Sequence, residues 1–407
     1  MKNLLKAGLG VVTSIAGFIE VGSLSTSAQA GAAFRFRLLW AIALATVCLI
    51  FLIEMSGRLA AVSKHTLAAA VRERFGIRFQ SVPLGAELVL DTLVLTAEIG
   101  GACVALHLLS GLDARWWALP VAFAAWFLLW RGRFSTIENG ISMLGLVALS
   151  FVIGVFVLRP DWGEVARGFI PSRPPEGSDQ AHYGYLAVSI LGATISPYLL
   201  NFYSAGAIED EWSEKDIVTN RIVSVFGMGF GSVVSMGVLA MSALVLAPRG
   251  IRVEQYEQAA LVLTQPFGKW GLPLFAASLF IGCFGAALEL GLNVSYVLSQ
   301  ALGWNWGEDQ KPKDDARFCT VYTAAILVGA ILIAAGVPPL KLTMFSMALT
   351  VLILPLVVFP FLVILNDPRY LRTHRNGRLS NLVVLAILAM GALLALIVIP
   401  LEVAGGR

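Results

Sequence analysis

The run GFIEVGS at residues 17–23 interrupts the first apolar stretch of the chain, and ISPY at residues 195–198 interrupts another apolar stretch about half a chain later. The first run places an ionisable side chain beside a glycine, and the second places a proline inside an apolar span. Such residues are costly in the hydrocarbon of a bilayer, and they are tolerated where broken helices line a cavity. We therefore expect unwound peptide at residues 20–23 and 193–198, facing one common cavity.

The composition is that of a polytopic α-helical membrane protein. Of the 407 residues, 57% are apolar and only 14% are charged. The net charge of +3 is too small to indicate a nucleic acid as partner. The four cysteines have no close spacing, which argues against both a disulfide framework and a zinc site. The sequence has no nucleophile–base pair, no ligand cluster such as His-x-x-x-His and no phosphate-binding glycine loop. We therefore expect neither an enzyme nor a bound cofactor.

Apolar windows of about 20 residues predict eleven transmembrane helices. The predicted cytoplasmic loops, 58–78 and 369–378 among them, are rich in arginine, which places the N-terminus in the cytoplasm. We expect a multi-pass protein of the cell inner membrane, with the lipid bilayer as its surroundings. The predicted spans are 8–32, 37–61, 81–108, 115–132, 138–158, 183–205, 220–247, 269–301, 317–336, 341–366 and 379–400.

The eleven spans divide into two halves of opposite topology. With five spans in each half, the first span starts inside and the sixth starts outside, so the two interruptions occupy equivalent positions. This is a leucine-transporter-like inverted repeat (5+5) with discontinuous helices 1 and 6, which is typical of secondary transporters. We expect one transmembrane transporter domain over residues 1–407, with repeats at about 8–158 and 183–366 and an extra helix at 379–400.

Three motifs carry a resemblance to a known family. GFIEVGS at 17–23, followed by QAGA at 29–32, resembles the first helix of the NRAMP divalent-metal transporters. TAEIG at 96–100 is similar to the third helix of that family, and GATISPY at 192–198 is similar to its sixth helix. The three motifs occur in order on the corresponding spans. The resemblance covers most of residues 8–366 and implies the NRAMP fold and metal transport.

The chain departs from the family pattern at positions that carry its chemistry. Glu20, Ser23 and Ser196 stand where the family has its metal-binding Asp, Asn and Met. Tyr198 replaces the histidine that follows the sixth-helix proline, and Leu95 replaces an aspartate of the third helix. These departures resemble the divergent NRAMP-related branch that includes magnesium transporters. A glutamine of the family's tenth helix falls on a methionine at position 347.

The residues at the two interruptions predict a metal site built from oxygen ligands. Glu20, Ser23, Ser196 and the carbonyl groups near Ala193 would form an all-oxygen cage, which suits Mg²⁺, Ca²⁺ or Mn²⁺. One carboxylate is little charge for a dication, so either the ion keeps several waters or a second carboxylate helps. The candidate is Glu289, in the eighth span. Its alternative role is a hydrogen bond between helices.

Further polar residues predict a path to this site. Glu87, Asp91 and Glu98 lie on one face of the third span and could conduct ions or protons. Alternatively, Glu87 and Asp91 pair with basic loop residues such as Arg58. Asn293 lies on roughly the same helical face as the eighth-span glutamate. The predicted substrate pathway comprises Tyr198, Glu98, Glu289 and Asn293.

We expect a secondary transporter for a hard divalent cation, Mg²⁺ or Mn²⁺, working by alternating access. Because Tyr198 and Leu95 replace titrating residues of the family, we expect weak or no proton coupling, and protons as co-substrate remain an open alternative. An alternative hypothesis keeps the same fold but assigns a different transported solute. A carboxylate at position 20 would also suit a small organic cation or an amino-acid-like solute, with Tyr198 offering a cation–π contact.

Overall fold

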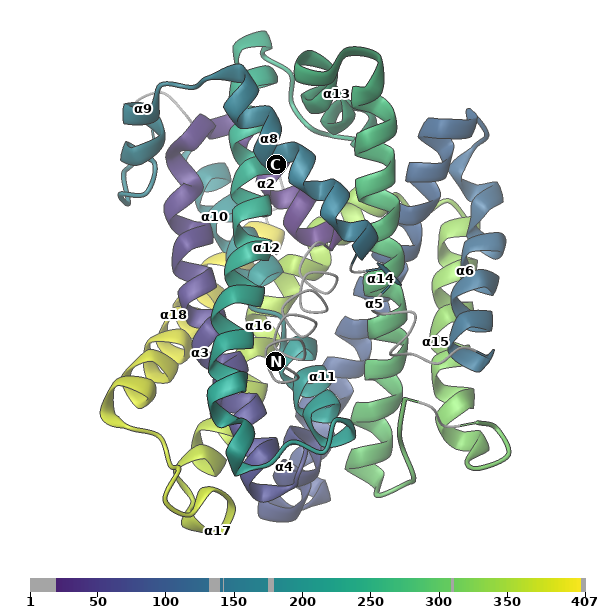
Figure 1. Ribbon diagram of the computed structural model, residues 1–407, viewed down its shortest axis with the longest axis vertical. Helices are drawn as coiled ribbons and strands as arrows, with labels where there is room; N and C mark the ends of the chain where they lie inside the picture. Colours follow the sequence, from purple (N-terminus) through teal and green to yellow (C-terminus); the bar gives the residue numbers. More distant parts are fainter. Residues whose placement is uncertain (1–19, 132–139, 142, 175–178, 309–310, 404–407) are drawn as a thin grey trace.

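All secondary structure in the described residues is helical. The computed structural model describes residues 20–131, 140–141, 143–174, 179–308 and 311–403 (Figure 1). The longer α-helices are α2 (Val21–Phe34), α3 (Leu39–Ser63), α5 (Ile77–Ser110), α6 (Ala114–Arg131), α8 (Leu149–Leu158), α10 (Gln180–Thr194), α11 (Pro197–Glu209), α12 (Ile217–Val245), α13 (Tyr256–Phe267), α14 (Gly271–Leu302), α15 (Ala316–Ala334), α16 (Pro339–Asn366) and α18 (Arg378–Val403). Shorter α-helices are α4 (Leu67–Phe75), α9 (Trp162–Arg167) and α17 (Pro368–Leu371).

The helices have the length and composition of membrane spans. Seven helical stretches in the described part of the chain are long and apolar enough to cross a membrane, and two shorter apolar helices cover Met143–Leu158 and Arg378–Leu393. The predicted windows 8–32 and 37–61 join within one apolar stretch, Val21–Ser63, because only a 3₁₀ turn separates α2 from α3. The prediction of an all-helical membrane protein is confirmed. Part of the windows 8–32 and 138–158 lies outside the described residues.

The outer surface is apolar, as lipid requires. Large hydrophobic side chains such as Phe123, Phe226 and Phe359 are more than half exposed, at 62%, 63% and 51%. In water such a surface would drive aggregation, whereas in a bilayer it faces acyl chains. Trp162 and Trp270 are exposed close to helix ends, where indole rings sit at the membrane–water interface.

The interior is assembled by close contacts between helix backbones. α5 packs along α14, α15 and α16, while α2 packs against α10 and α12. The α2–α12 contact depends on Gly31, because a Cβ atom there would lie 2.1 Å from the carbonyl oxygen of Leu239. Small residues allow helices to approach in this way within membranes. The glycine of the QAGA motif therefore holds α2 against α12.

The second predicted interruption is present and is narrower than expected, whereas at the first the described residues begin at Glu20, directly before α2. Glu20 has extended backbone (φ −92°, ψ 164°), and α2 begins at the next residue. α10 ends at Thr194, Ile195 and Ser196 are non-helical, and α11 begins at Pro197. Proline suits the first position of a helix because its missing N–H would have no intrahelical partner there. The expectation of unwound peptide throughout 20–23 and 193–198 was therefore wrong for the residues from 21 to 23, for 193–194 and for 197–198.

Candidate ion site at two helix breaks

The two breaks meet at the carboxylate of Glu20. The hydroxyl of Tyr198, in the first turn of α11, donates to Glu20 Oε2 at 3.3 Å. The other carboxylate oxygen, Oε1, is buried and has no hydrogen-bond partner among the described residues. The two residues are 2% and 0% exposed. A buried carboxyl oxygen without a partner is costly, and a cation beside it would stabilise the ionised form of the acid.

Glu98 determines where α2 begins. The backbone N–H of Val21 donates to Glu98 Oε1 at 3.0 Å and to Oε2 at 3.2 Å. The first N–H groups of a helix have no intrahelical acceptor and carry partial positive charge, so a carboxylate is a favourable partner. The charge of Glu98 also interacts with those of Glu20 and Glu289. Glu98 therefore anchors the half-helix that follows Glu20.

A thioether lies beside this carboxylate. A Cβ atom added to Gly22 would be 2.6 Å from Met347 Sδ and 3.3 Å from Glu20 Oε1, so the sulfur and the open oxygen flank the same point of α2. The backbone of Met347 also contacts α10, because a Cβ atom at Gly192 would lie 2.1 Å from its carbonyl oxygen. Met347 thus sits between the first turn of α2 and the last turn of α10. From the sequence alone, this position is recognisable only as one where the chain lacks the glutamine of the family's tenth helix.

The remaining predicted ligands lie at the breaks. Ser23 is buried in the first turn of α2, and Ser196 is buried at the non-helical step between α10 and α11. Ala193 is buried in the last turn of α10, where carbonyl groups lack intrahelical donors. Glu289, on α14, is buried and interacts electrostatically with Tyr198.

Asn293 lies apart from this group. Its Nδ2 atom donates to Asp91 Oδ2 at 2.8 Å, so it pairs with α5. Glu87, one turn away on α5, accepts a hydrogen bond from Asn201. Arg58 contacts neither acid in the described structure, because it forms an ion pair with Glu54 at 3.2 Å. The suggested pairing of Arg58 with the α5 acids is not what the structure shows.

A polar contact layer covers the site on the side of α13. Ser25 Oγ donates to Tyr256 Oη at 2.9 Å, and Tyr256 Oη lies 3.2 Å from Thr343 Oγ1. All three residues are at least 98% buried. These bonds tie α2, α13 and α16 together above the breaks. Glu20 and Tyr198 are buried as well.

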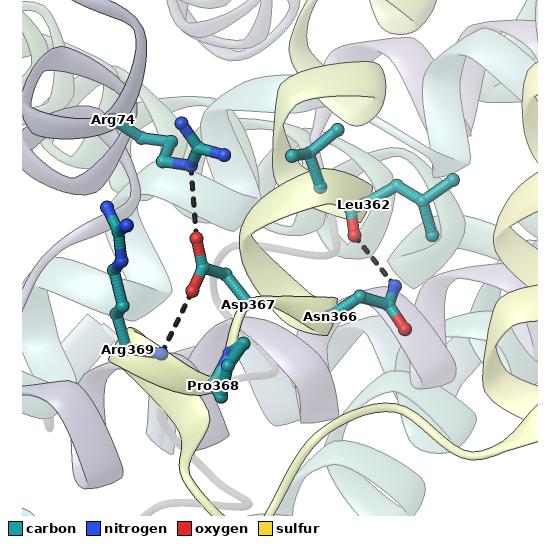
Figure 2. Close-up of a pocket in the computed structure, with 7 residues that line it drawn as sticks. Arg74, Leu362, Asn366, Asp367, Pro368 and Arg369 are labelled. Carbon is teal, nitrogen blue, oxygen red and sulfur yellow. Dashed lines mark hydrogen bonds and ion pairs between the residues drawn. The ribbon is translucent and has the colours of Figure 1, made fainter.

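A surface groove lies apart from the helix breaks, at the end that carries α4 and α17, and has a volume of about 600 Å³. Figure 2 shows the residues that line it. Its walls include Leu362, Asn366 and Pro368, and it is crossed by an ion pair between Arg74 and Asp367 at 3.0 Å. The arrangement is that of an exposed surface groove, separate from the helix breaks.

No ready-made cluster of metal ligands accompanies the site. Among the described residues, no three His, Cys, Asp or Glu side chains come together as a group that could hold a metal ion. The donors at the breaks are instead one open carboxylate oxygen, hydroxyl and carbonyl groups, and a thioether. An ion held there would take most of its ligands from unwound backbone and neutral side chains, as in transporters with discontinuous helices.

Fold and site together define a multi-pass membrane protein in which interrupted helices enclose a buried carboxylate, the architecture of secondary transporters. The profile of the family Nramp, natural resistance-associated macrophage protein-like, matches residues 10–400. The chain belongs to this family. The resemblance carried by the three sequence motifs is thereby confirmed, although the sequence identity between this chain and its relatives is low.

Several known proteins are similar to this chain in sequence or in fold. The chain is 28% identical to the divalent metal cation transporter MntH of Deinococcus radiodurans over 290 residues, 67% of this chain and 63% of that protein. It is 26% identical to MntH of Bacillus subtilis over 406 residues, 95% of this chain and 91% of that one. A manganese transporter of Eremococcus coleocola superposes with a TM-score of 0.82 at 20% identity, covering 98% of this chain and 87% of that chain. Mhp1, a nucleobase-cation-symport-1 family transporter, gives a TM-score of 0.62 at 16% identity, with coverages of 96% and 91%. The structural matches show the shared fold.

Proposed function

We propose that this chain is a secondary transporter that carries a divalent metal cation by alternating access. The observation that carries the proposal is the buried Oε1 atom of Glu20, which has no hydrogen-bond partner in the described part of the chain and lies where the start of α2 meets the break between α10 and α11. An uncompensated carboxylate oxygen beside free helix ends is suited to a cation. The relatives named MntH are divalent metal cation transporters, which supports the same class of substrate.

Among divalent cations, the site favours Mn²⁺ over Mg²⁺. The sequence suggested an all-oxygen cage because Ser196 replaces a methionine of the family. The thioether of Met347, on α16, lies beside the open oxygen of Glu20 and changes this view. Thioether ligands favour transition metals over hard ions, and Mg²⁺ keeps its waters and requires oxygen ligands. The manganese transporter of Eremococcus coleocola shares the fold.

The architecture proposed for this transport is the eleven-helix inverted repeat. Repeats at about 8–158 and 183–366, an added helix at 379–400, a cytoplasmic N-terminus and an inner-membrane location form the frame in which the two breaks are equivalent. The superposition on a manganese transporter supports this frame. The arginine-rich segments 58–78, which contains α4, and 369–378, which begins in α17, lie at one end of the molecule, which we assign to the cytoplasm (Figure 1).

Transport through this site is weakly coupled to protons or uncoupled. The family's histidine is replaced by Tyr198, which donates to Glu20, and its third-helix aspartate is replaced by Leu95, which is buried. Neither side chain exchanges protons near neutral pH. The alternative of an organic cation gains no support, because Glu20 and Tyr198 bond directly to each other and are buried.

The test is uptake by purified protein in liposomes. Glu20→Gln removes the charge and keeps the shape, and we expect Mn²⁺ uptake to fall at least about tenfold, since a charge-assisted contact contributes about 1.5–3 kcal/mol. Glu164→Gln, which neutralises an exposed carboxylate paired with Arg35, is the matched control and should transport normally. Normal uptake by Glu20→Gln would refute the proposed site.

Ion choice and coupling are tested in the same liposomes. Met347→Leu preserves volume and removes sulfur, so the preference for Mn²⁺ over Mg²⁺ should shrink. An unchanged preference would show that the thioether does not select the ion. A pH-sensitive dye enclosed in the liposomes should report little acidification during Mn²⁺ uptake. Acidification in proportion to Mn²⁺ entry would refute uncoupled transport.

A further inference from the structure

Two acid–amide pairs lie beside the candidate ion site, and neither belongs to it. Asp91 Oδ2 accepts a hydrogen bond from Asn293 Nδ2 at 2.8 Å, and Glu87 Oε1 accepts one from Asn201 Nδ2. The four residues are between 0% and 4% exposed. They come from three helices, α5, α11 and α14, which also carry Glu98, Tyr198 and Glu289. The second group of polar residues is therefore built on the helices that frame the first.

All four side chains are displaced from the central site toward the same end. α5 starts next to α4, so Asp91, seven residues before Glu98, lies about 10 Å nearer to α4. α11 and α14 run toward α4, because Ser204 Oγ accepts a hydrogen bond from Leu67 N, and the end of α14 lies against Arg72. Asn201 and Asn293 are therefore about one helical turn below the central site as well. The displacement is toward the proposed cytoplasmic end.

The hydrogen bonding of these pairs is incomplete. Asp91 Oδ1 and Asn293 Oδ1 are both buried and have no hydrogen-bond partner among the described residues. Buried polar atoms in folded proteins are almost always bonded, so two orphan oxygens on facing residues indicate a missing group. An amide oxygen and an ionised carboxylate oxygen both accept, so a bound cation satisfies them, as does a proton or a water molecule.

The acids also lack a positive partner. In the described residues, no ion pair or hydrogen bond links a Lys, Arg or His side chain to Glu87 or Asp91. The nearest candidate from the sequence, Arg58, is bound to Glu54 and to Asn376 Oδ1. The two carboxyl groups are close enough for their charges to interact. Two interacting buried acids without a counter-charge are costly when both are ionised, and a bound cation would stabilise the ionised pair in place of protons.

A small cavity adjoins this group on the side of α4. It has a volume of about 20 Å³ and is lined by Glu87, Asn201, Gln80 and residues of α4, α14 and α16. This volume is enough for about one water molecule. The Oε1 atom of Gln80 is another buried acceptor without a partner. Polar groups thus continue from the acid–amide pairs toward the α4 end.

We propose that Glu87, Asp91, Asn201 and Asn293 form a second, inner cation site, which the transported ion occupies after it leaves Glu20. The inference rests on the proposed transport of a divalent cation. Two carboxylates and two amide oxygens are a ligand set that hard and borderline divalent ions accept, with water completing the shell. The second site lowers the cost of moving a dication from the centre of the protein to its cytoplasmic end.

Binding stoichiometry tests the inner site. The probe is Mn²⁺ alone, measured by equilibrium dialysis on the purified full-length protein in detergent. We expect two ions per wild-type chain, one in Glu20→Gln, one in Asp91→Asn and none in the double variant. Glu164→Gln, the surface control, should keep both ions. A wild-type chain that binds one ion, or an Asp91→Asn chain that keeps two, would overturn the inner site.

A gain-of-binding variant guards against loss of folding. Asn293→Asp adds an anionic ligand to the inner site, and an unfolded chain cannot imitate the tighter binding expected from it. The second Mn²⁺ should bind at least about tenfold more tightly than in the wild type. Unchanged or weaker binding of that ion would overturn the inference. If Glu20→Gln alone keeps every ion, the proposed function fails; if only the Asp91 and Asn293 variants behave like wild type, the inner site fails alone.

Discussion

Gly192→Ala tests whether the end of α10 must touch the backbone of α16. Gly192 lies two residues before the end of α10, and a methyl group there would be 2.1 Å from the carbonyl oxygen of Met347 and 3.0 Å from Val351 Cγ2. An ordinary contact starts at 3.4 Å, so the two helices would have to separate by more than an ångström. Because the carbonyl oxygen of Met347 belongs to the backbone, it cannot rotate away from the added methyl group.

The same helix offers a matched control. A methyl group added at Gly184 would meet nothing within 4 Å. Both substitutions gain about 0.5–1 kcal/mol from replacing glycine by alanine in a helix, and this gain cancels in the comparison. The remaining difference is the overpacking cost, typically about 1–3 kcal/mol. We therefore expect Gly192→Ala to be less stable than Gly184→Ala by about that amount.

Denaturant unfolding in detergent, followed by tryptophan fluorescence, measures the difference. The same two variants should differ in Mn²⁺ binding, because a shift of α16 moves the thioether of Met347 away from Gly22 and Glu20. We expect binding to weaken at least about tenfold in Gly192→Ala, since 1.4 kcal/mol corresponds to a factor of ten. Equal unfolding midpoints and equal binding in the two variants would refute the view that this contact positions the site.

Three further predictions concern other contacts. Glu98→Ala removes the acceptor of the Val21 N–H and should destabilise the protein by about 1–3 kcal/mol, with Glu98→Gln intermediate; equal unfolding midpoints would mean that the N–H finds another acceptor. Gly31→Ala places a methyl group 2.1 Å from a carbonyl oxygen of α12, so its unfolding midpoint should fall, and an unchanged midpoint would contradict the close contact. Asp315 pairs with Arg317 at 2.8 Å, and hydrogen bonding to Arg317 lowers the pKa of Asp315 below its ordinary 3.8. Its stabilisation is present above that ordinary value and is lost as the pH falls through the lowered pKa. The difference in melting temperature between wild type and Asp315→Ala should therefore shrink on acidification, and a constant difference would contradict the assignment.

Helix positions were largely predictable from the sequence because apolar length is a strong signal in a membrane protein. The window 81–108 corresponds to α5, which begins earlier, at Ile77. Its first turns carry Arg78 and Gln80, which a hydropathy window excludes. They are helical nevertheless, because Gln80 Nε2 donates to the carbonyl group of Ala68 and holds α5 against α4. Hydropathy cannot register a bond of this kind.

The sequence predicts where the helices are broken, but it does not predict how many residues are non-helical at each break. A glutamate beside glycine and a serine–proline step mark interruptions in any apolar span. Their width depends on whether the first N–H of each new half-helix has a partner. Val21 finds one in Glu98, seventy-seven positions along the chain, and Pro197 needs none. Both half-helices therefore start at once, and only Glu20, Ile195 and Ser196 remain non-helical among the described residues of the two breaks.

The partners of the α5 acids were beyond the reach of sequence reasoning. Spacing placed Glu87 and Asp91 on one face of a helix, and charge suggested Arg58 as their partner. The structure brings neutral amides, Asn201 and Asn293, from α11 and α14. Which helix meets that face depends on packing between distant segments, and spacing along one chain contains no signal for it. The position of the Met347 thioether beside Glu20 could not be predicted from the sequence for the same reason.

Glu98 and Glu20 differ in what their oxygens already bind. Both oxygens of Glu98 accept the Val21 N–H, so its charge is balanced by the start of α2. Glu20 has one oxygen bonded to Tyr198 and one open, and the open atom lies beside Met347. An ion at the proposed Glu20 site would therefore be held by a single free carboxylate oxygen, a thioether and neutral dipoles.

Weak holding at Glu20 favours release, provided that negative charge lies farther along the path. Asp91 and Glu87 supply that charge on the proposed cytoplasmic side, about two and three helical turns of α5 beyond Glu98. In the other direction, the path from Glu20 meets the hydroxyl groups of Ser25, Tyr256 and Thr343, which carry no charge. Carboxylate groups thus continue from Glu20 on the proposed cytoplasmic side, whereas the residues named on the other side are uncharged. In the proposed mechanism, these carboxylates would lower the energy of the ion step by step toward the proposed cytoplasmic side, which would give the site a preferred direction of release without a proton to displace the ion.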